Sequence, residues 1–250
     1  MTGFGPFLMK ELREISATWR LFVLPVTLLF CAVASPLLAL ATPYLVKSVA
    51  NLPLTLPDPS VADAYAQWTK NLGQIALLVV IVSFSSAVNG ERTSGTAAIA
   101  LSKGLTPAAF IVAKVTAAFA LVAVPTALAT VVMGLTTRAV FGDAAWGPLI
   151  RATADWLVLA LWCVTVVILL SALLDSTSAT AGLGIAAFVA LASLSGWGPA
   201  ARWSPAGLVN APAALATGSE TAWTWPGLTA LATAALCVAG AVLVMRRREL

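Results

Sequence analysis

The chain has 250 residues, of which 60% are hydrophobic and only 10% are charged. Soluble globular domains carry roughly 25% charged residues, so this composition excludes an ordinary soluble fold and indicates a membrane protein. The net charge of +4 comes from basic residues scattered along the chain, which excludes the clustered basic surface of a nucleic-acid-binding protein.

The first residues predict an amphipathic helix that lies in the membrane interface. Between Phe4 and Arg20, apolar residues recur every three or four positions, and Trp19 is suited to headgroup depth. The charged residues of this predicted interfacial helix are Lys10, Glu11, Arg13 and Glu14.

Six apolar segments are long enough, or nearly so, to cross a bilayer, which takes about 20 residues in a helix. A signal peptide ending at Ala39-Leu40-Ala41 is an alternative for the first segment, but the charged leader and the apolar run are both long for one. We therefore predict an all-α integral membrane protein in which residues 1–250 form a single transmembrane domain. The predicted spans are residues 21–42, 72–88, 108–135, 156–174, 179–194 and 226–245.

Two longer connecting segments are predicted on the outer side of the membrane. Residues 47–71 are polar and proline-rich, which favours an external loop with a short helix near 61–69. Residues 195–225 contain four tryptophans and favour an external region at the interface, lying on the surface or re-entrant. The turn at 175–178 is so short that the fourth and fifth spans should be adjacent and antiparallel.

The distribution of lysine and arginine predicts the topology. With the N-terminus inside and six spans, nine of the 14 basic residues fall on the inner side and five on the outer side. This bias agrees with the positive-inside rule, so both termini are predicted to be cytoplasmic. The inner set is Lys10, Arg13, Arg20, Arg92, Lys103, Lys114, Arg246, Arg247 and Arg248, and the outer set is Lys47, Lys70, Arg138, Arg151 and Arg202.

Several kinds of chemistry are excluded or disfavoured by the sequence. No G-x-x-x-x-G-K-[ST] motif is present, so the chain lacks the usual phosphate-binding loop for ATP. There is no histidine, and the three cysteines lie inside apolar runs, so neither a metal site nor a disulfide framework is expected. The acids Glu91, Asp155 and Asp175 are far apart in sequence, which disfavours an intramembrane enzyme. Asp155 follows Arg151 by four residues, which predicts an ion pair on one helical face.

The stretch Gly90-Glu91-Arg92-Thr93-Ser94-Gly95-Thr96 is polar and lies between two apolar runs. A short helix is expected to follow over residues 97–101, and then a turn that ends at Thr106-Pro107. A short helix that projects from a membrane bundle gives a soluble partner a surface to push against. An ordinary charged loop between two helices is the alternative.

This stretch, followed by Leu101, Lys103, Thr106-Pro107 and Ala113-Lys114, resembles the acidic–basic-x-x-Gly-Thr, Pro and Gly-Lys pattern of type-2 ABC transporter permeases. The segment Lys10-Glu11-Leu12-Arg13-Glu14 is similar to the leading amphipathic helix of that family. Residues 204–210 and 246–250 also resemble small bacterial permeases of this kind. The sequence departs from the pattern at Ala113, where many members have glycine, and at Gly104-Leu105, where the approach to the proline is usually more polar.

The resemblance implies six helices per subunit, two paired permease subunits and a separate ATP-hydrolysing subunit bound to each. ATP and magnesium would be held by that partner and not by this chain. Residues 90–107 would form the coupling segment, and Glu91 would pair with Lys10, Arg13 or Arg92. The residues that the resemblance assigns to coupling and docking are Glu91, Arg92, Thr93, Ser94, Gly95, Thr96, Leu101, Lys103, Pro107 and Lys114.

We therefore expect the permease subunit of an ABC exporter in a bacterial inner membrane, acting as a homodimer or a heterodimer. The implied cargo is small or amphiphilic, such as a drug, a lipid or a peptide. The alternative is a membrane factor that transports nothing and acts in immunity, sensing or assembly.

Overall fold

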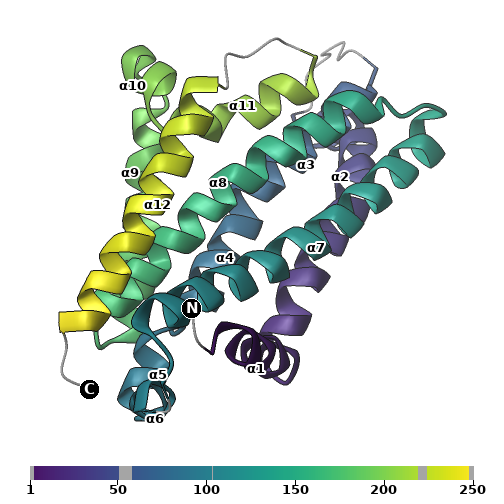
Figure 1. The fold of residues 1–250 in the computed structure, drawn as a ribbon. Coiled ribbons are helices and arrows are strands. Elements are labelled where there is room, and N and C mark those ends of the chain that lie inside the picture. The colour runs from purple at the N-terminus through teal and green to yellow at the C-terminus, as the bar shows by residue number, and fades with distance from the viewer. Residues whose placement is uncertain (1–2, 51–57, 103, 219–223, 248–250) are drawn as a thin grey trace.

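The computed structural model describes residues 3–50, 58–102, 104–218 and 224–247, and within these ranges every regular element is a helix. Figure 1 shows long helices packed side by side, with short helices at both ends of the bundle. The first half comprises α1 (Phe4–Ser16), α2 (Arg20–Ala50), α3 (Val61–Asn71), the π-helix η1 (Leu72–Ala76), α4 (Leu77–Phe84), α5 (Asn89–Thr93) and α6 (Thr96–Ser102). The second half comprises α7 (Pro107–Phe141), α8 (Trp146–Leu173), α9 (Thr177–Leu194), α10 (Gly198–Trp203), α11 (Gly207–Ala216) and α12 (Thr224–Arg247).

Six helical segments of the described chain are long and apolar enough to cross a membrane, which confirms the predicted all-α membrane fold. They are Leu21–Val46, Val61–Thr93, Pro107–Phe141, Trp146–Leu173, Thr177–Leu194 and Thr224–Arg247.

The boundary of the second span differs from the sequence prediction. Residues 47–71 were expected to form an external loop with a short helix near 61–69. That helix is present as α3, but it runs on into η1 and α4 as part of the second span, while α2 continues to Ala50 and residues 51–57 lie outside the described ranges. Helix α3 begins at a capping box, in which the Ser60 hydroxyl accepts the Asp63 N–H and the Asp63 carboxylate accepts the Ser60 N–H. Hydropathy leaves α3 out of the span because this helix is polar on average, yet it buries Tyr65 and Trp68.

The third and fourth spans are also longer than predicted. The third was expected to end at residue 135, but α7 continues to Phe141, and the Thr136 and Thr137 hydroxyls donate to carbonyls one turn earlier in the same helix. Gly142 then ends α7 with a φ of 81°, a left-handed conformation that glycine adopts at low cost. The fourth was expected to begin at residue 156 and instead begins at Trp146.

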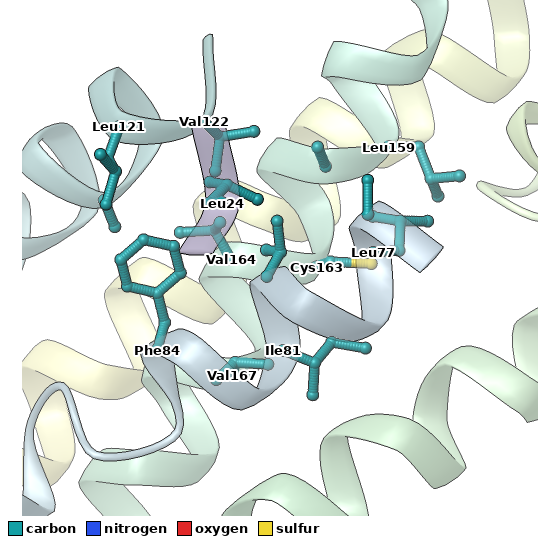
Figure 2. Close-up of a cluster of buried hydrophobic side chains, with 14 of the residues drawn as sticks. Leu24, Leu77, Ile81, Phe84, Leu121, Val122, Leu159, Cys163, Val164 and Val167 are labelled. Carbon is teal, nitrogen blue, oxygen red and sulfur yellow. The ribbon is translucent and has the colours of Figure 1, made fainter. Parts of the chain in front are cut away.

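The core lies between α4, α7 and α8. Figure 2 shows Leu77, Ile81 and Phe84 of α4 meeting Val164 and Val167 of α8, with side chains of α2 and α7 closing the cluster. The outward faces of the long helices are apolar as well, and they expose phenylalanine and leucine side chains such as Phe30, Leu128 and Leu236. A helix that is hydrophobic on all sides is suited to packing on one face and to lipid on the other.

The two ends of the bundle differ. Figure 1 shows α1, α5, α6 and the end of α12 at one end, which we call the α6 end. The turn between α8 and α9 lies there too, because Asn89 of α5 bonds to Thr180 of α9. Helices α3 and α11 and the α7–α8 turn lie at the opposite end, which we call the α11 end. Short helices α10 and α11 occupy the region 195–225, and residues 219–223 lie outside the described ranges.

Close packing of α9 depends on a glycine. A Cβ at Gly184 would lie 2.9 Å from Ile81 Cγ2 and 3.2 Å from Val167 Cγ2, whereas a Cβ at Gly182 would meet nothing within 4 Å. We expect Gly184→Val to lower the free energy of unfolding by about 1–3 kcal/mol through overpacking. Gly182→Val on the same helix is the control, and thermal unfolding in detergent measures both. Equal melting temperatures for the two variants would contradict the close approach of α4, α8 and α9.

Candidate functional site

Helices α5 and α6 form a compact hook at the α6 end (Figure 1). Gly95 makes the turn between them with a φ of 76°, so the glycine of the motif is needed for its backbone conformation. The hydroxyls of Ser94 and Thr96 both donate to the Glu91 carbonyl, at 3.2 and 3.1 Å, and the Thr93 hydroxyl donates to the Asn89 carbonyl at 2.9 Å. The polar residues of the motif therefore close the hook upon itself.

The Glu91 carboxylate lies at the centre of a group of charges from three helices. Lys10 of α1 donates to Glu91 Oε1, and Lys114 of α7 lies with its Nζ 3.3 Å from the same oxygen. Lys114 Nζ also donates to both oxygens of Glu11, each at 3.1 Å, and Lys10 pairs with Glu14 at 2.6 Å. We call Lys10, Glu11, Glu14, Glu91 and Lys114 the ion cluster.

The ion cluster is largely removed from solvent. Lys114 is 4% exposed, Glu11 7% and Glu91 8%, so each needs an opposite charge close by. The rings of Phe7 and Phe110 cover the cluster, with the Lys114 ammonium 4.9 Å from the centroid of Phe110. An ammonium over an aromatic face gains further electrostatic stabilisation.

The charges of the ion cluster shift the pKa values of its α1 members. Burial lowers the pKa of Lys10, but hydrogen bonds to Glu14 and Glu91 outweigh this effect, so the pKa lies above its usual value. Burial raises the pKa of the Glu11 carboxyl, and Lys114 opposes the increase while the neighbouring Glu91 carboxylate adds to it. The oxygens of the three carboxylates lie within 4.8 Å of one another, as a cation site requires. Two lysine ammoniums already contact these carboxylates, so the cluster is built around ammonium groups.

A second set of contacts holds the hook to the end of α8. Between α4 and α5 the backbone leaves the regular helical pattern, and Ser171 Oγ of α8 accepts the N–H groups of Val88 and Asn89 at 3.0 and 3.1 Å. This hydroxyl supplies the cap that α5 lacks in its own sequence. The Asn89 amide donates to Thr180 of α9 at 3.2 Å.

Arg92 extends this second set. Its Nη1 donates to the Ala172 carbonyl at 2.7 Å, and its guanidinium pairs with Asp175 in the α8–α9 turn. We call the contacts of Asn89 and Arg92 with α8, α9 and their turn the α8–α9 anchor.

The structure selects among the partners that the sequence left open for Glu91. Lys10 is a partner of Glu91, while Arg92 points instead to Asp175. Arg13 is exposed on α1. The sequence analysis missed the contact of Lys114 with Glu11 and Glu91, although a lysine inside an apolar helix signals a buried partner.

The remaining predicted site residues are spread along the segment. Leu101 packs partly buried against the core, and Pro107 occupies the first turn of α7, where the Thr106 hydroxyl caps the Ala109 N–H. Lys103 lies outside the described residues.

The predicted ion pair between Arg151 and Asp155 is wrong. Arg151 Nε instead donates to the Gly147 carbonyl at 3.4 Å, and neither oxygen of the buried Asp155 carboxylate has a hydrogen-bond partner within the described chain. A spacing of four residues brings two side chains to one helical face, but Arg151 is exposed and Asp155 is turned into the protein.

Comparison with known sequences decides the family. The sequence profile described as "ABC-2 family transporter protein" matches residues 8–202, well over half of the chain. The chain belongs to the ABC-2 transporter family. The matched region contains the whole ion cluster and the α8–α9 anchor. Membership makes this chain the membrane subunit of an ABC transporter, which works with a separate ATPase subunit.

One relative in Bacillus subtilis (strain 168) is the uncharacterized transmembrane protein YxlG. It is 26% identical to this ABC-2 protein over 210 residues, which cover 80% of this chain and 79% of the relative. The similarity therefore extends over most of both chains, and the relative is a transmembrane protein whose activity is not stated.

Lys114 is the member of the ion cluster whose loss should cost most. Lys114→Met would leave Glu11 and Glu91 buried with one lysine between them, and breaking a buried ion pair in this way costs about 3–5 kcal/mol. Lys10→Met should cost less, because the Lys10 side chain is 45% exposed. Chemical unfolding in detergent measures both variants.

The double variant Glu11→Met with Lys114→Met tests whether Lys114 and Glu11 form a buried ion pair by removing both charges. Replacing both partners of a buried pair with apolar side chains removes the unpaired charge, so stability should be partly restored relative to Lys114→Met. A wild-type stability for Lys114→Met alone would contradict the assignment.

Proposed function

We propose that this chain is the permease subunit of an ATP-driven exporter and that the hook α5–α6 transmits force from the ATPase subunit to the helix bundle. The observation that carries the proposal is the double attachment of the short helix α5. The ion cluster joins it to α1 and α7, and the α8–α9 anchor joins it to the other side of the bundle.

The double attachment supports coupling because the two sets of contacts reach different helices. A displacement of α5 has to move α1 and α7 on one side and the α8–α9 turn on the other, or break buried ion pairs and hydrogen bonds. A ligand shifts an equilibrium only through contacts that differ between two states. In this proposal, ATP binding on the partner changes the contacts of the hook, and the hook biases the bundle toward an outward-open arrangement.

The tip of the hook offers a docking surface. Thr93, Ser94 and Thr96 are exposed, and Ile99 on α6 is 57% exposed although it is apolar. An exposed apolar side chain on a short helix that projects from the bundle is a suitable contact for a soluble partner.

The orientation that we propose follows from the charges at the two ends. The α6 end carries Lys10, Arg92 and the arginines that close α12. Basic residues concentrate on the cytoplasmic side of membrane proteins, so we place the α6 end and both termini in the cytoplasm of a bacterial inner membrane. This orientation directs the hook toward the compartment that contains ATP.

Cargo and assembly are part of the same proposal. A small or amphiphilic substrate is the one we propose, carried by two permease subunits, identical or similar, with two ATPase subunits. The alternative function, a membrane factor for immunity, sensing or assembly, would not require an ATPase partner. Purification of the chain from native membranes with an ATPase of matching stoichiometry separates the two.

Glu91→Gln is the variant that tests coupling. It keeps the shape of the side chain but removes the charge that both lysines contact, so it should at least halve substrate-stimulated ATP hydrolysis and transport in proteoliposomes. Asp143→Asn is the control, because Asp143 is an exposed acid at the opposite end of the bundle and outside the ion cluster. Unchanged coupling in Glu91→Gln would refute the proposed role of the ion cluster.

Ile99→Asp tests docking separately from coupling. A carboxylate in place of the exposed apolar side chain should weaken binding of the ATPase subunit by about tenfold or more, because a desolvated interface contact is replaced by a charge. Ile150→Asp changes a similarly exposed residue on α8 and is the control. Affinity is measured by titrating purified ATPase onto the permease in nanodiscs, and equal affinities would argue against the α6 tip as the contact.

A further inference from the structure

Asp155 is a buried acid that the proposed coupling mechanism does not use. Its side chain lies within α8 and is 6% exposed, and both carboxylate oxygens lack a hydrogen-bond partner in the described chain. Asp155 lies nine residues after the start of α8, which is about 14 Å along the helix from the α11 end. A charge inside a membrane helix without a partner is costly, and such residues usually mark a ligand or ion pathway.

A cavity is lined in part by Asp155, although its two carboxylate oxygens are themselves closed to solvent. It measures about 310 Å³ and is lined by Arg151, Ala154, Asp155 and Val158 of α8 and by Leu215 of α11. Small-molecule sites range from about 300 to 1,000 Å³, so the cavity is large enough for a compact ligand. The four α8 residues lie on one helical face, and the walls apart from Arg151 and Asp155 are aliphatic.

We infer that this cavity is a binding site for an amphiphilic amine, in which the Asp155 side chain turns toward the cavity to receive the ammonium group and Val158 and Leu215 contact the apolar body. The carboxylate accepts hydrogen bonds from N–H donors, and an ammonium supplies both the donors and the opposite charge. Arg151 is exposed on the same helical face and is bonded to Gly147, so in this structure its guanidinium does not fill the position that the amine would take.

If the amine is the exported substrate, this inference rests on the proposed export function. Binding of the amine to the cavity, by contrast, requires only the permease chain. The test therefore uses the full-length permease in lipid nanodiscs without ATPase or ATP, with 4-phenylbutylamine as the probe and 4-phenylbutanol as its neutral counterpart. Isothermal titration calorimetry measures both affinities.

The wild type should bind the amine at least about tenfold more tightly than the alcohol, as a charge-assisted hydrogen bond implies. Asp155→Asn should remove this preference without lowering the melting temperature, because it removes an unpaired buried charge. Asp143→Asn, an exposed acid at the same end of the bundle, should leave the preference unchanged. Leu215→Trp should weaken binding of both probes by filling the cavity.

Arg151→Gln gives an independent test, in which amine affinity is not expected to decrease. It removes a positive charge beside the cavity, so amine affinity should increase or stay the same. A decrease in amine affinity in Arg151→Gln would overturn the inference, and so would an amine preference that persists in Asp155→Asn. A wild type that binds no amine, together with a dimer that dissociates in Asp155→Asn, would overturn it as well. If the amine site is overturned but the complex still transports substrate with ATP, the proposed export function is retained. If the permease binds the amine but no ATP-driven transport occurs, the amine site is retained and the export function is refuted.

Discussion

Lys114 places an ammonium group inside the protein, about two turns into a long apolar helix, and much of the α6 end is arranged around it. A buried cation requires compensating carboxylates at hydrogen-bond distance. Glu11 supplies one from α1, which brings that helix across the end of α7. Glu91 supplies another from α5, which fixes where the hook leaves the bundle. The electrostatic requirement of one side chain thus brings together three segments far apart in sequence.

The attachment on the other side of the hook is of a different kind. The chain between α4 and α5 leaves the regular helical pattern, and buried backbone N–H groups that lose their helical partners need an acceptor. Ser171 of α8 accepts two of them, and the Asn89 amide reaches α9. Neutral hydrogen bonds therefore hold one side of α5, together with the Arg92 ion pair, while the ion cluster holds the other. An element bound in this way to two parts of a bundle passes its own displacement on to both of them.

The sequence predicted the helical architecture well because hydropathy reports on the lipid-facing surface, and six apolar runs leave few alternatives. It was weaker where polar segments are helical. A short helix near residues 61–69 was predicted, but its low hydropathy concealed that it belongs to the second span and buries Tyr65 and Trp68. The third span also extended beyond the polar residues 136–138, whose threonine hydroxyls bond within their own helix, to a second apolar stretch at 139–141.

Site prediction included the partner Lys10 for Glu91 but did not choose it over Arg13 and Arg92, and it missed Lys114. The segment around Glu91 was found from its polarity and from the family resemblance, but Glu91 and Lys10 lie 81 positions apart and their contact depends on packing. The pairing of Arg151 with Asp155 was inferred from helical spacing alone, and spacing does not determine whether either side chain turns into the core or toward solvent. The position of Lys114 inside an apolar run was the signal that could have located the ion cluster, since a lone lysine in an apolar helix demands a carboxylate.

The central claim is that the hook, α1 and the α8–α9 turn move as one unit against the rest of the bundle. Double electron–electron resonance on the complex with its ATPase subunit tests it, with the three native cysteines replaced and spin labels at Ser102 of α6, Leu12 of α1 and Ser178 of α9. Between the nucleotide-free and ATP-trapped states, the account predicts constant distances among these three labels and a change from Ser102 to a fourth label at Asp143. A shift of Ser102 relative to both Leu12 and Ser178, with the distance to Asp143 unchanged, would contradict it.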